Sequence, residues 1–332
     1  MANYPQLDDC SGVWTLKEVK DAVMGGYWRN AGSRGLFAGG DTGSAINVID
    51  YVVMASTGNA TDFGDLTVTK KHATAVSSHT RFVSMGGHTP SPVTNVMDYV
   101  TIMTTGNAAD FGDLSAATNF TGSASNSTRA LRMGGTTPSY VDIIEFVTMT
   151  STGDTADFGN LTAATAGVGG AASPTRVIRG GGDANGLTNV IDYVEIATTG
   201  NAIDFGDLAT AKSDMANSNI CSSTRGVFAG GTSPYTTVIQ KVEMASTGNA
   251  IDYGDLTVGR GYVAGTSNSV RGIQAGGNPG SSPNKDNVID YQSIAHGGTA
   301  LDFGDLNNTV AGPTGGSNCH GGLNDGYQGT RP

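Results

Sequence analysis

Positive charge is scarce in this sequence, and cysteine is scarcer. Eighteen lysines and arginines stand against 29 aspartates and glutamates, so the formal net charge is −11. Nucleic-acid binding needs a basic surface that neutralises phosphates, and we therefore expect no nucleic-acid partner. Three cysteines are too few and too scattered for a disulfide framework and indicate a reduced compartment, although Cys10 and Cys319, near opposite ends of the chain, could meet.

Long apolar runs and catalytic motifs are also missing. No segment has the roughly 20 apolar residues that cross a bilayer, and residues 1–9 lack the basic start and apolar run of a secretory signal. No nucleophile elbow, Walker loop, His-Glu-x-x-His or dinucleotide fingerprint occurs. His72, His79 and His88 cluster without partner ligands in other units, which favours loop positions over a metal site. We expect no membrane insertion, enzyme activity, cofactor or metal.

What the sequence has is a repeat. The signature Asp-Phe-Gly-Asp-Leu, with small variations, occurs six times at gaps of 48, 47, 47, 48 and 50 residues; its first residues are Asp62, Asp110, Asp157, Asp204, Asp252 and Asp302. Self-similarity at about 40 to 50 residues is typical of propellers and other repeat arrays. An open solenoid is the competing architecture, but it needs polar caps at both ends, and none is apparent.

Each unit predicts strands in a fixed register. A large side chain precedes the signature's aromatic by twelve residues, as Tyr51 precedes Phe63, with a Thr-Gly-Asn turn midway, which predicts a hairpin. The signature's glycine predicts a bulge or bend. Before each hairpin an arginine leads a Gly-Gly pair by five residues, as Arg34 leads Gly39. This indicates another strand, ending where the backbone needs positive φ or close neighbours. A small-residue segment between units supplies a fourth strand.

The chain ends predict closure. Residues 34–66 supply three strands, and one unmatched strand follows Leu306, roughly over 309–318. A C-terminal strand that completes the first sheet leaves no exposed edge. We therefore predict an all-β, six-bladed propeller in residues 34–332, with an N-terminal extension over residues 1–33. The predicted blades are 34–66 plus 307–320, 67–114, 115–161, 162–208, 209–256 and 257–306.

The order of these features resembles the kelch repeat. An apolar strand ends in Gly-Gly, an aromatic follows, and a second aromatic lies twelve residues later, before a leucine. The resemblance covers residues 34 to about 320 and implies four-stranded propeller blades. The chain has Phe63 and its equivalents where kelch units usually carry tryptophan, and Lys241 replaces the first aromatic of the fifth unit.

Much of the acidic charge belongs to the repeat. The hairpins contribute Asp50, Asp98, Glu145, Asp192 and Asp290 besides the aspartates of the signatures. We expect these carboxylates to accept turn amides or to pair with the six repeated arginines. A ring of calcium sites is the alternative, but no unit has the dense oxygen-ligand spacing of a calcium loop.

The N-terminal extension holds the best helix candidate. Residues 11–24 place Leu16, Val19 and Val23 on one face, and the two tryptophans, Trp14 and Trp28, flank this stretch. Two roles are open: packing over the ring, or anchoring the chain to another subunit.

The extension and the repeats carry a second resemblance. The segment Gly-Val-Trp-Thr-Leu at residues 12–16, with Trp28, is similar to a segment of structural, tail-fibre-like proteins of tailed bacteriophages. The repeated Asn-Val-Ile-Asp-Tyr-Val and Asp-Phe-Gly-Asp-Leu motifs resemble repeats in virion proteins of marine and cyanobacterial phages. These resemblances imply a virion component, assembled in the host cytoplasm in many copies. Its implied partners are other virion structural proteins and a host-surface receptor or glycan.

The loops after each Gly-Gly pair vary most between units. They are rich in proline, and they include His88, Tyr140 and Tyr235. Stiff loops on a rigid scaffold lose little entropy on binding, so these residues are the predicted contact surface, although ordinary tolerant loops would look the same. The function predicted is a phage tail-fibre, appendage or capsid-decorating protein. An intracellular kelch-type adaptor and a carbohydrate-active propeller enzyme are the alternatives.

Overall fold

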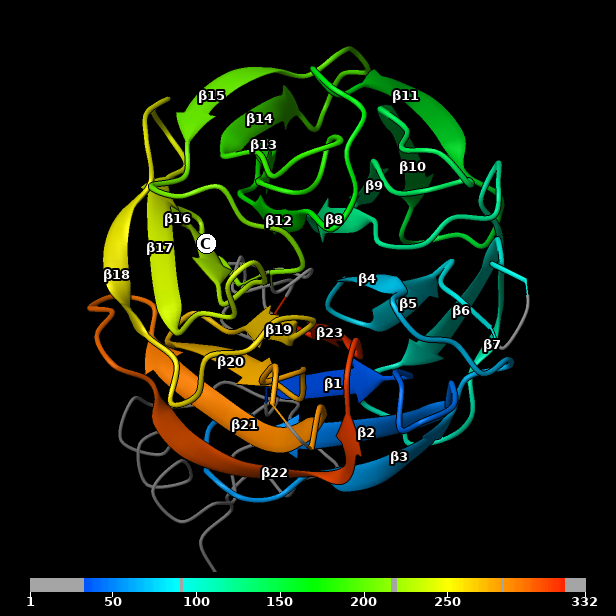
Figure 1. The fold of residues 1–332 in the computed structure, drawn as a ribbon. Helices are drawn as coiled ribbons and strands as arrows, with labels where there is room; N and C mark the ends of the chain where they lie inside the picture. The colour runs from blue at the N-terminus through cyan, green and yellow to red at the C-terminus, as the bar shows by residue number, and fades with distance from the viewer. Residues whose placement is uncertain (1–32, 90–91, 216–219, 282, 320–332) are drawn as a thin grey trace, which may run out of the picture.

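The chain folds into six antiparallel sheets arranged in a ring (Figure 1). The computed structural model describes residues 33–89, 92–215, 220–281 and 283–319. Blade 1 contains β1 (Arg34–Ala38), β2 (Val48–Val53), β3 (Thr61–Asp65) and β23 (Thr314–Ser317). Blade 2 contains β4 (Thr74–Ser77), β5 (Arg81–Met85), β6 (Val96–Thr101) and β7 (Ala109–Asp113). Blade 3 contains β8 (Gly122–Ser125), β9 (Arg129–Met133), β10 (Ile143–Thr148) and β11 (Ala156–Asn160).

The second half repeats this plan. Blade 4 contains β12 (Gly169–Ala172), β13 (Arg176–Gly180), β14 (Val190–Glu195) and β15 (Ile203–Asp207). Blade 5 contains β16 (Arg225–Ala229), β17 (Val238–Glu243) and β18 (Ile251–Asp255). Blade 6 contains β19 (Ala264–Ser267), β20 (Arg271–Ala275), β21 (Asp286–Ser293) and β22 (Leu301–Val310). In blade 5, residues 220 and 221 run beside β16 at the innermost position, through the Val227 N–H···O Ile220 bond and a Cys221–Gly226 bridge.

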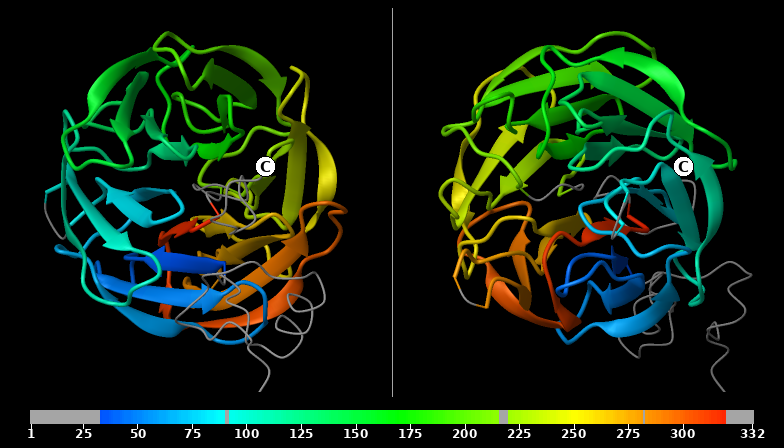
Figure 2. Two further views of the ribbon diagram at one scale, coloured as in Figure 1. Left: turned by 180° about the vertical axis from the view of Figure 1, so that it is seen from behind. Right: turned by 45° about the vertical axis from the view of Figure 1, so that its right-hand side comes forward.

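The ring closes as predicted. The C-terminal strand β23 pairs with β1 in antiparallel register, Gly35 opposite Ser317 and Ala38 opposite Thr314. The red and blue strands lie side by side in Figures 1 and 2. The prediction of an all-β, six-bladed propeller is therefore confirmed. The helix predicted within residues 11–24 lies outside the described residues, and among those described no helix is present, hence none long and apolar enough to cross a membrane.

The cores lie between neighbouring blades. In β2, Ile49 and Val52 are both buried although they lie on opposite faces of the strand. Ile49 shares a cluster with Phe63 of its own blade and Phe82 of the next, whereas Val52 packs with blade 6. A strand covered on both faces has to be apolar along its length, which is what the Val-Ile-x-Tyr-Val pattern provides.

The glycines of the repeat behave as expected. Gly39, the first of its pair, has φ of 66°, and a Cβ there would lie 2.5 Å from the Lys70 carbonyl oxygen. Gly64 of the signature lies beside a register shift between Ile49 and Asp50, the predicted bulge. A Cβ on Gly64 would lie 2.4 Å from the carbonyl oxygen of Gly106 in blade 2. Both positions therefore need glycine for conformation and for close approach between segments.

The six repeated arginines hold neighbouring blades together, but not through the repeated carboxylates. Arg34 lies 4.7 Å from the ring centre of Tyr51, and its Nη1 donates to the Ile102 carbonyl of blade 2 at 3.2 Å. The pattern recurs round the ring to Arg271, which donates to Met54 of blade 1. The prediction that these arginines pair with the repeated carboxylates was wrong. The antiparallel register sets Arg34 diagonally from Tyr51 on one sheet face and not beside an aspartate.

A second set of cations pairs with those carboxylates. Four buried pairs lie at 2.5 to 2.6 Å between nitrogen and oxygen: Lys70–Asp98, Arg132–Glu145, Arg179–Asp192 and Arg260–Asp290. Burial lowers the pKa of Lys70, Arg132 and Arg179 against the opposing effect of each carboxylate. An expected turn contact is also present, since Glu145 accepts at 3.2 Å from the amide of Ser115, in the segment that follows β7.

In blade 1, no cation of the described residues pairs with the equivalent carboxylate, Asp50. Asp50 instead accepts two bonds from Asn307, one from the amide N–H at 3.2 Å and one from the side chain at 2.6 Å. Burial raises the pKa of Asp50, and the bonds from Asn307 oppose the shift. A substitution at Asp50 therefore measures what a repeated carboxylate contributes to the stability of the fold when it has no buried ion pair.

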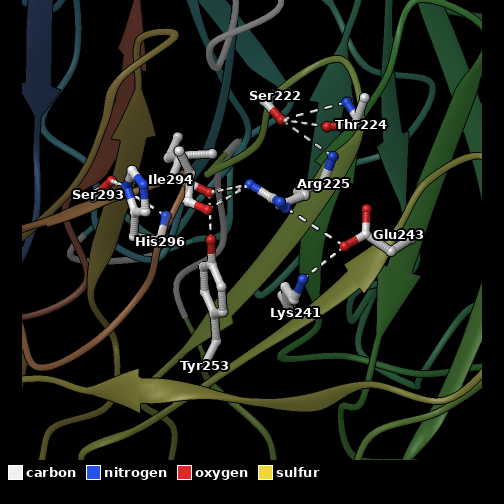
Figure 3. A network of polar contacts seen from close by, with 10 residues as sticks. Ser222, Thr224, Arg225, Lys241, Glu243, Tyr253, Ser293, Ile294 and His296 are labelled. Carbon is white, nitrogen blue, oxygen red and sulfur yellow. Dashed lines mark hydrogen bonds and ion pairs between the residues drawn. The ribbon is translucent and has the colours of Figure 1, made fainter.

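Blade 5 departs from the arginine pattern (Figure 3). Lys241 stands where the other blades have an aromatic, and its Nζ lies 5.1 Å from the ring centre of Tyr253. Glu243 accepts from Lys241 at 2.7 Å and lies 3.5 Å from Nε of Arg225. Tyr253 replaces the usual phenylalanine, and its hydroxyl donates to Ile294, the residue that Arg225 also reaches. The two residues of blade 5 that differ from the repeat, Lys241 and Tyr253, thus belong to a single network of contacts.

Small residues fill the centre of the ring. Ser125 Oγ donates to the Ser77 carbonyl at 2.8 Å, and the same kind of bond joins Ser267 to Cys221 and Ser317 to Ser267. These side chains come from equivalent positions of the innermost strands and are buried. These bonds join the innermost segments of blades 2 and 3, of blades 5 and 6, and of blades 6 and 1.

Candidate functional site

The two ends of the ring differ. The loops after the Gly-Gly pairs lie at one end, which we call the loop face, and the arginine contacts lie at the other, the staple face. This follows from strand direction, because β1 begins at Arg34 and runs toward Gly39 and Gly40. The sequence varies most between units on the loop face, which makes this end the better candidate for a binding surface.

Six residues on the loop face form what we call the axial ring. Each precedes the innermost strand of its blade, and its amide donates to the carbonyl of the equivalent residue in the blade before it, at 2.7 to 3.1 Å. The cycle closes, since His72 donates to Gly312 and Gly312 to Tyr262. The members are His72, Phe120, Gly167, Asp214, Tyr262 and Gly312.

All members of the axial ring have positive φ, between 52° and 65°. Glycine adopts this conformation freely, and Gly167 and Gly312 do so. Phe120 and Tyr262 carry bulky side chains in the same conformation, which is uncommon and costs energy. The repeat thus tolerates glycine here, and four blades nevertheless keep a side chain.

An aromatic cluster occupies one side of the axis. His72 and Phe120 stack with ring centres 4.5 Å apart, and His72 meets Tyr262 edge-on at 5.2 Å. Burial lowers the pKa of His72 to about 4, with nearby Lys71 adding to the effect. His72 is therefore neutral at neutral pH and contributes no positive charge to the axis.

A pocket of about 240 Å³ lies beside this cluster. Its lining comes from blades 3 to 6: Phe120, Thr136, Tyr140, Ala166, Gly167, Asp183, Ser213, Asp214 and Tyr262. Asp183 and Asp214 are its charged groups, and no lysine, arginine or histidine of the described residues lines it. The pocket is therefore both acidic and aromatic.

Three hydroxyl groups bond to the Asp214 carboxylate. Oδ2 of Asp214 accepts from Ser213 at 3.1 Å and from Thr232 at 3.0 Å, and Tyr262 also bonds to this carboxylate. Burial raises the pKa of Asp214 in spite of these bonds, and Asp183 adds to the increase. Burial and Asp214 raise the pKa of Tyr262, so the phenol stays protonated and donates.

The predicted contact residues are brought together only in part. Tyr140 lines the pocket and bonds to Asp183. Tyr235, 38% exposed, packs over Gly280 on the same face but is not part of the lining. His88 forms an isolated backbone bridge with Lys71 on the other side of the axis. The remaining predicted contacts lie outside the described residues: Trp14, Leu16, Val19, Val23 and Trp28.

Sequence reasoning missed the axial ring, although a signal was present. Each member lies ten residues after the first aspartate of its signature, as His72 follows Asp62 and Tyr262 follows Asp252. The residues at this offset are three ring-bearing residues, two glycines and one aspartate, so the position does not appear as a motif. In the sequence, His72 stands out only as one of three clustered histidines.

A larger depression of about 400 Å³ lies on the staple face, lined by Arg176 and Glu195 among others. These two side chains pair with each other at 2.8 Å, and Arg176 also reaches the carbonyls of Met244 and Ala245. Its charged groups thus have partners within the fold. Across the described residues, no group of three or more His, Cys, Asp or Glu side chains is placed to hold a metal ion.

Comparison with protein-family models and with curated proteins finds no match for this chain.

Proposed function

We propose that this chain is a non-catalytic attachment module that binds through its loop face. The observation that carries the proposal is the contrast at the axial ring, where a repeating backbone presents His72, Phe120, Asp214 and Tyr262 in four blades and glycine in two. Rigid scaffolds commonly place binding residues on such positions. The pocket beside the ring offers concave surface with a few convergent polar groups, as ligand sites do.

We further propose that the module belongs to a bacteriophage particle. This part has its support in the sequence, from the Gly-Val-Trp-Thr-Leu segment with Trp28 and from the repeated hairpin motifs. The acidic net charge is compatible with partners that are proteins or surface glycans. On this proposal residues 1–33 anchor the propeller to other virion proteins, and the loop face points toward a host surface.

Two measurements test the proposal separately. Mass spectrometry of purified particles should detect peptides of this chain, and their restriction to the soluble fraction of infected cells would favour the intracellular adaptor. Binding of the labelled protein to host cells should fall at least about tenfold when Tyr140 and Tyr235 are both changed to alanine. Val270→Ala is the matched control, because Val270 is 61% exposed on the staple face. Equal binding by all variants would contradict a role for the loop face.

The carbohydrate-active enzyme remains the competing class. Incubation with a glycan library should release no product if the module only binds. Sustained turnover that disappears in Asp183→Asn or Asp214→Asn would replace the present proposal with a catalytic one.

A further inference from the structure

The pocket beside the axial ring has negative charge and aromatic surface together. Asp183 and Asp214 line it with Phe120, Tyr140 and Tyr262, all of them partly exposed. Neither carboxylate forms an ion pair with another described residue. Uncompensated carboxylates at the edge of a low-dielectric site favour a cationic occupant.

Two lysines that could neutralise these carboxylates, one on the loop face and one close in sequence, are engaged elsewhere. Lys71 pairs with Asp41 at 2.9 Å in the blade 1 and blade 2 sector of the loop face. Lys212, two residues before Asp214, is buried, and the carboxylates that act on it are Asp252 and Asp255. Among the described residues, the fold therefore leaves Asp183 and Asp214 without a cation of their own, although Lys212 lies close in sequence.

Gly167 makes room for the Asp214 carboxylate at the pocket wall. A Cβ at this position would lie 2.7 Å from Oδ1 of Asp214, so this oxygen lies over the glycine at the pocket wall. Oδ2 is the atom that Ser213 and Thr232 hold. A cavity of about 150 Å³ is large enough for benzene, so the volume of about 240 Å³ admits a small organic group.

We propose that this pocket binds an organic ammonium group, with Asp183 and Asp214 supplying the charge and Phe120, Tyr140 and Tyr262 the aromatic wall. Carboxylates and aromatic rings are the two kinds of group that recognise such cations. The inference rests on the proposed binding role of the loop face and names the ligand class of one site within it.

Choline is the first probe, with 3,3-dimethyl-1-butanol as the neutral molecule of the same shape. Isothermal titration calorimetry should detect choline and not the alcohol. Nα-acetyl-lysine methylamide, in a second titration, distinguishes a lysine side chain from a methylated ammonium; binding of either cation supports the site. Equal affinity for choline and the alcohol, binding of a neutral methyl hexoside alone, or no binding of either cation would overturn the proposal.

The repeat supplies a matched control for the variants, because an equivalent aspartate lies in another blade outside the pocket. Asp214→Asn and Asp183→Asn should each weaken choline binding at least about tenfold, since each keeps shape and removes charge. Asp41→Asn is matched to Asp183→Asn: both aspartates follow a Gly-Gly pair and accept a nearby loop amide at 2.8 Å, but Asp41 is paired with Lys71 outside the pocket. Its affinity should stay within about twofold. An equal loss in Asp41→Asn would contradict the site.

Failure here is distinguishable from failure of the proposed function. If no cation binds while the Tyr140 and Tyr235 double variant still loses cell binding, the loop face is an attachment surface and the ammonium site is wrong. If choline binds but that double variant attaches normally, the site stands and the attachment surface does not.

Discussion

At the scale of the residue, the repeated carboxylates differ in what depends on them. Asp98 and Lys70 form a pair with no exposed side-chain surface on either partner, at 2.6 Å. Asp98→Asn leaves a buried lysine uncompensated, so we expect a loss of about 3 kcal/mol in the free energy of unfolding. Asp50→Asn leaves no cation behind, and exposed Asn307 can reorient, so its loss should stay below about 1 kcal/mol. Denaturant titration of both variants at pH 7 measures the difference. Equal losses would show that the ion pair adds nothing.

His72 gives a dependence of stability on pH. Its pKa is lowered to about 4 in the folded chain, from 6.5. Between these values the unfolded chain binds a proton that the folded chain does not, so stability falls as the pH falls. The loss amounts to about 2 kcal/mol between pH 8 and pH 5. His72→Phe should remove this part of the pH dependence, and Phe120 shows that phenylalanine is compatible with this backbone. Parallel stability curves for the two proteins over this range would contradict the shift.

At the scale of the element, Lys241 and Tyr253 of blade 5 should be coupled. In the other blades the first position is aromatic, as is Tyr193, and the second is phenylalanine. Tyr253→Phe removes the hydroxyl that donates to Ile294, and Lys241→Tyr removes the pair with Glu243. Each should cost about 1 kcal/mol, whereas the double variant, which recreates the edge-on Tyr–Phe pair of the other blades, should match the wild type. Tyr193→Phe in blade 4 is the control and should be nearly neutral. Additive losses in the double variant would refute the coupling.

The elements were predictable because their signals are local. Twelve residues between Tyr51 and Phe63 fix the hairpin register, and Gly64 marks its bulge. The contacts of Arg34 could not be predicted in the same way. The charge of a residue does not indicate which side chain lies diagonally opposite it on the neighbouring strand. The lining of the pocket was even less predictable from the sequence. Phe120, Asp214 and Tyr262 meet only because the ring brings chemically unlike residues, 48 to 142 positions apart in the sequence, to one axis. Of the predicted contacts that the structure describes, His88, Tyr140 and Tyr235, only Tyr140 lines it.

At the scale of the whole molecule, closure depends on β23 reaching the centre. A Cβ on Gly316 would lie 2.8 Å from the Phe82 ring and 3.2 Å from the Ser77 Cβ of blade 2. Gly316→Val should therefore cost about 2 kcal/mol or more and leave the edge of β1 open to association. Gly200→Val is the control, since nothing lies within 4 Å of a Cβ there. Thermal unfolding and light scattering after size exclusion report both effects. A monomeric variant with unchanged stability would argue against this role of β23.

The axial ring has an electrostatic consequence for the whole loop face. Its six amide-to-carbonyl bonds run head to tail around a circle, so their dipoles point along the tangent and largely cancel at the centre. Unlike a helix end, this circle has no positive or negative pole. The polarity at the axis is consequently set by the side chains at six interchangeable positions, and a change in one blade can alter what the face attracts while the hydrogen-bonded circle beneath it stays intact.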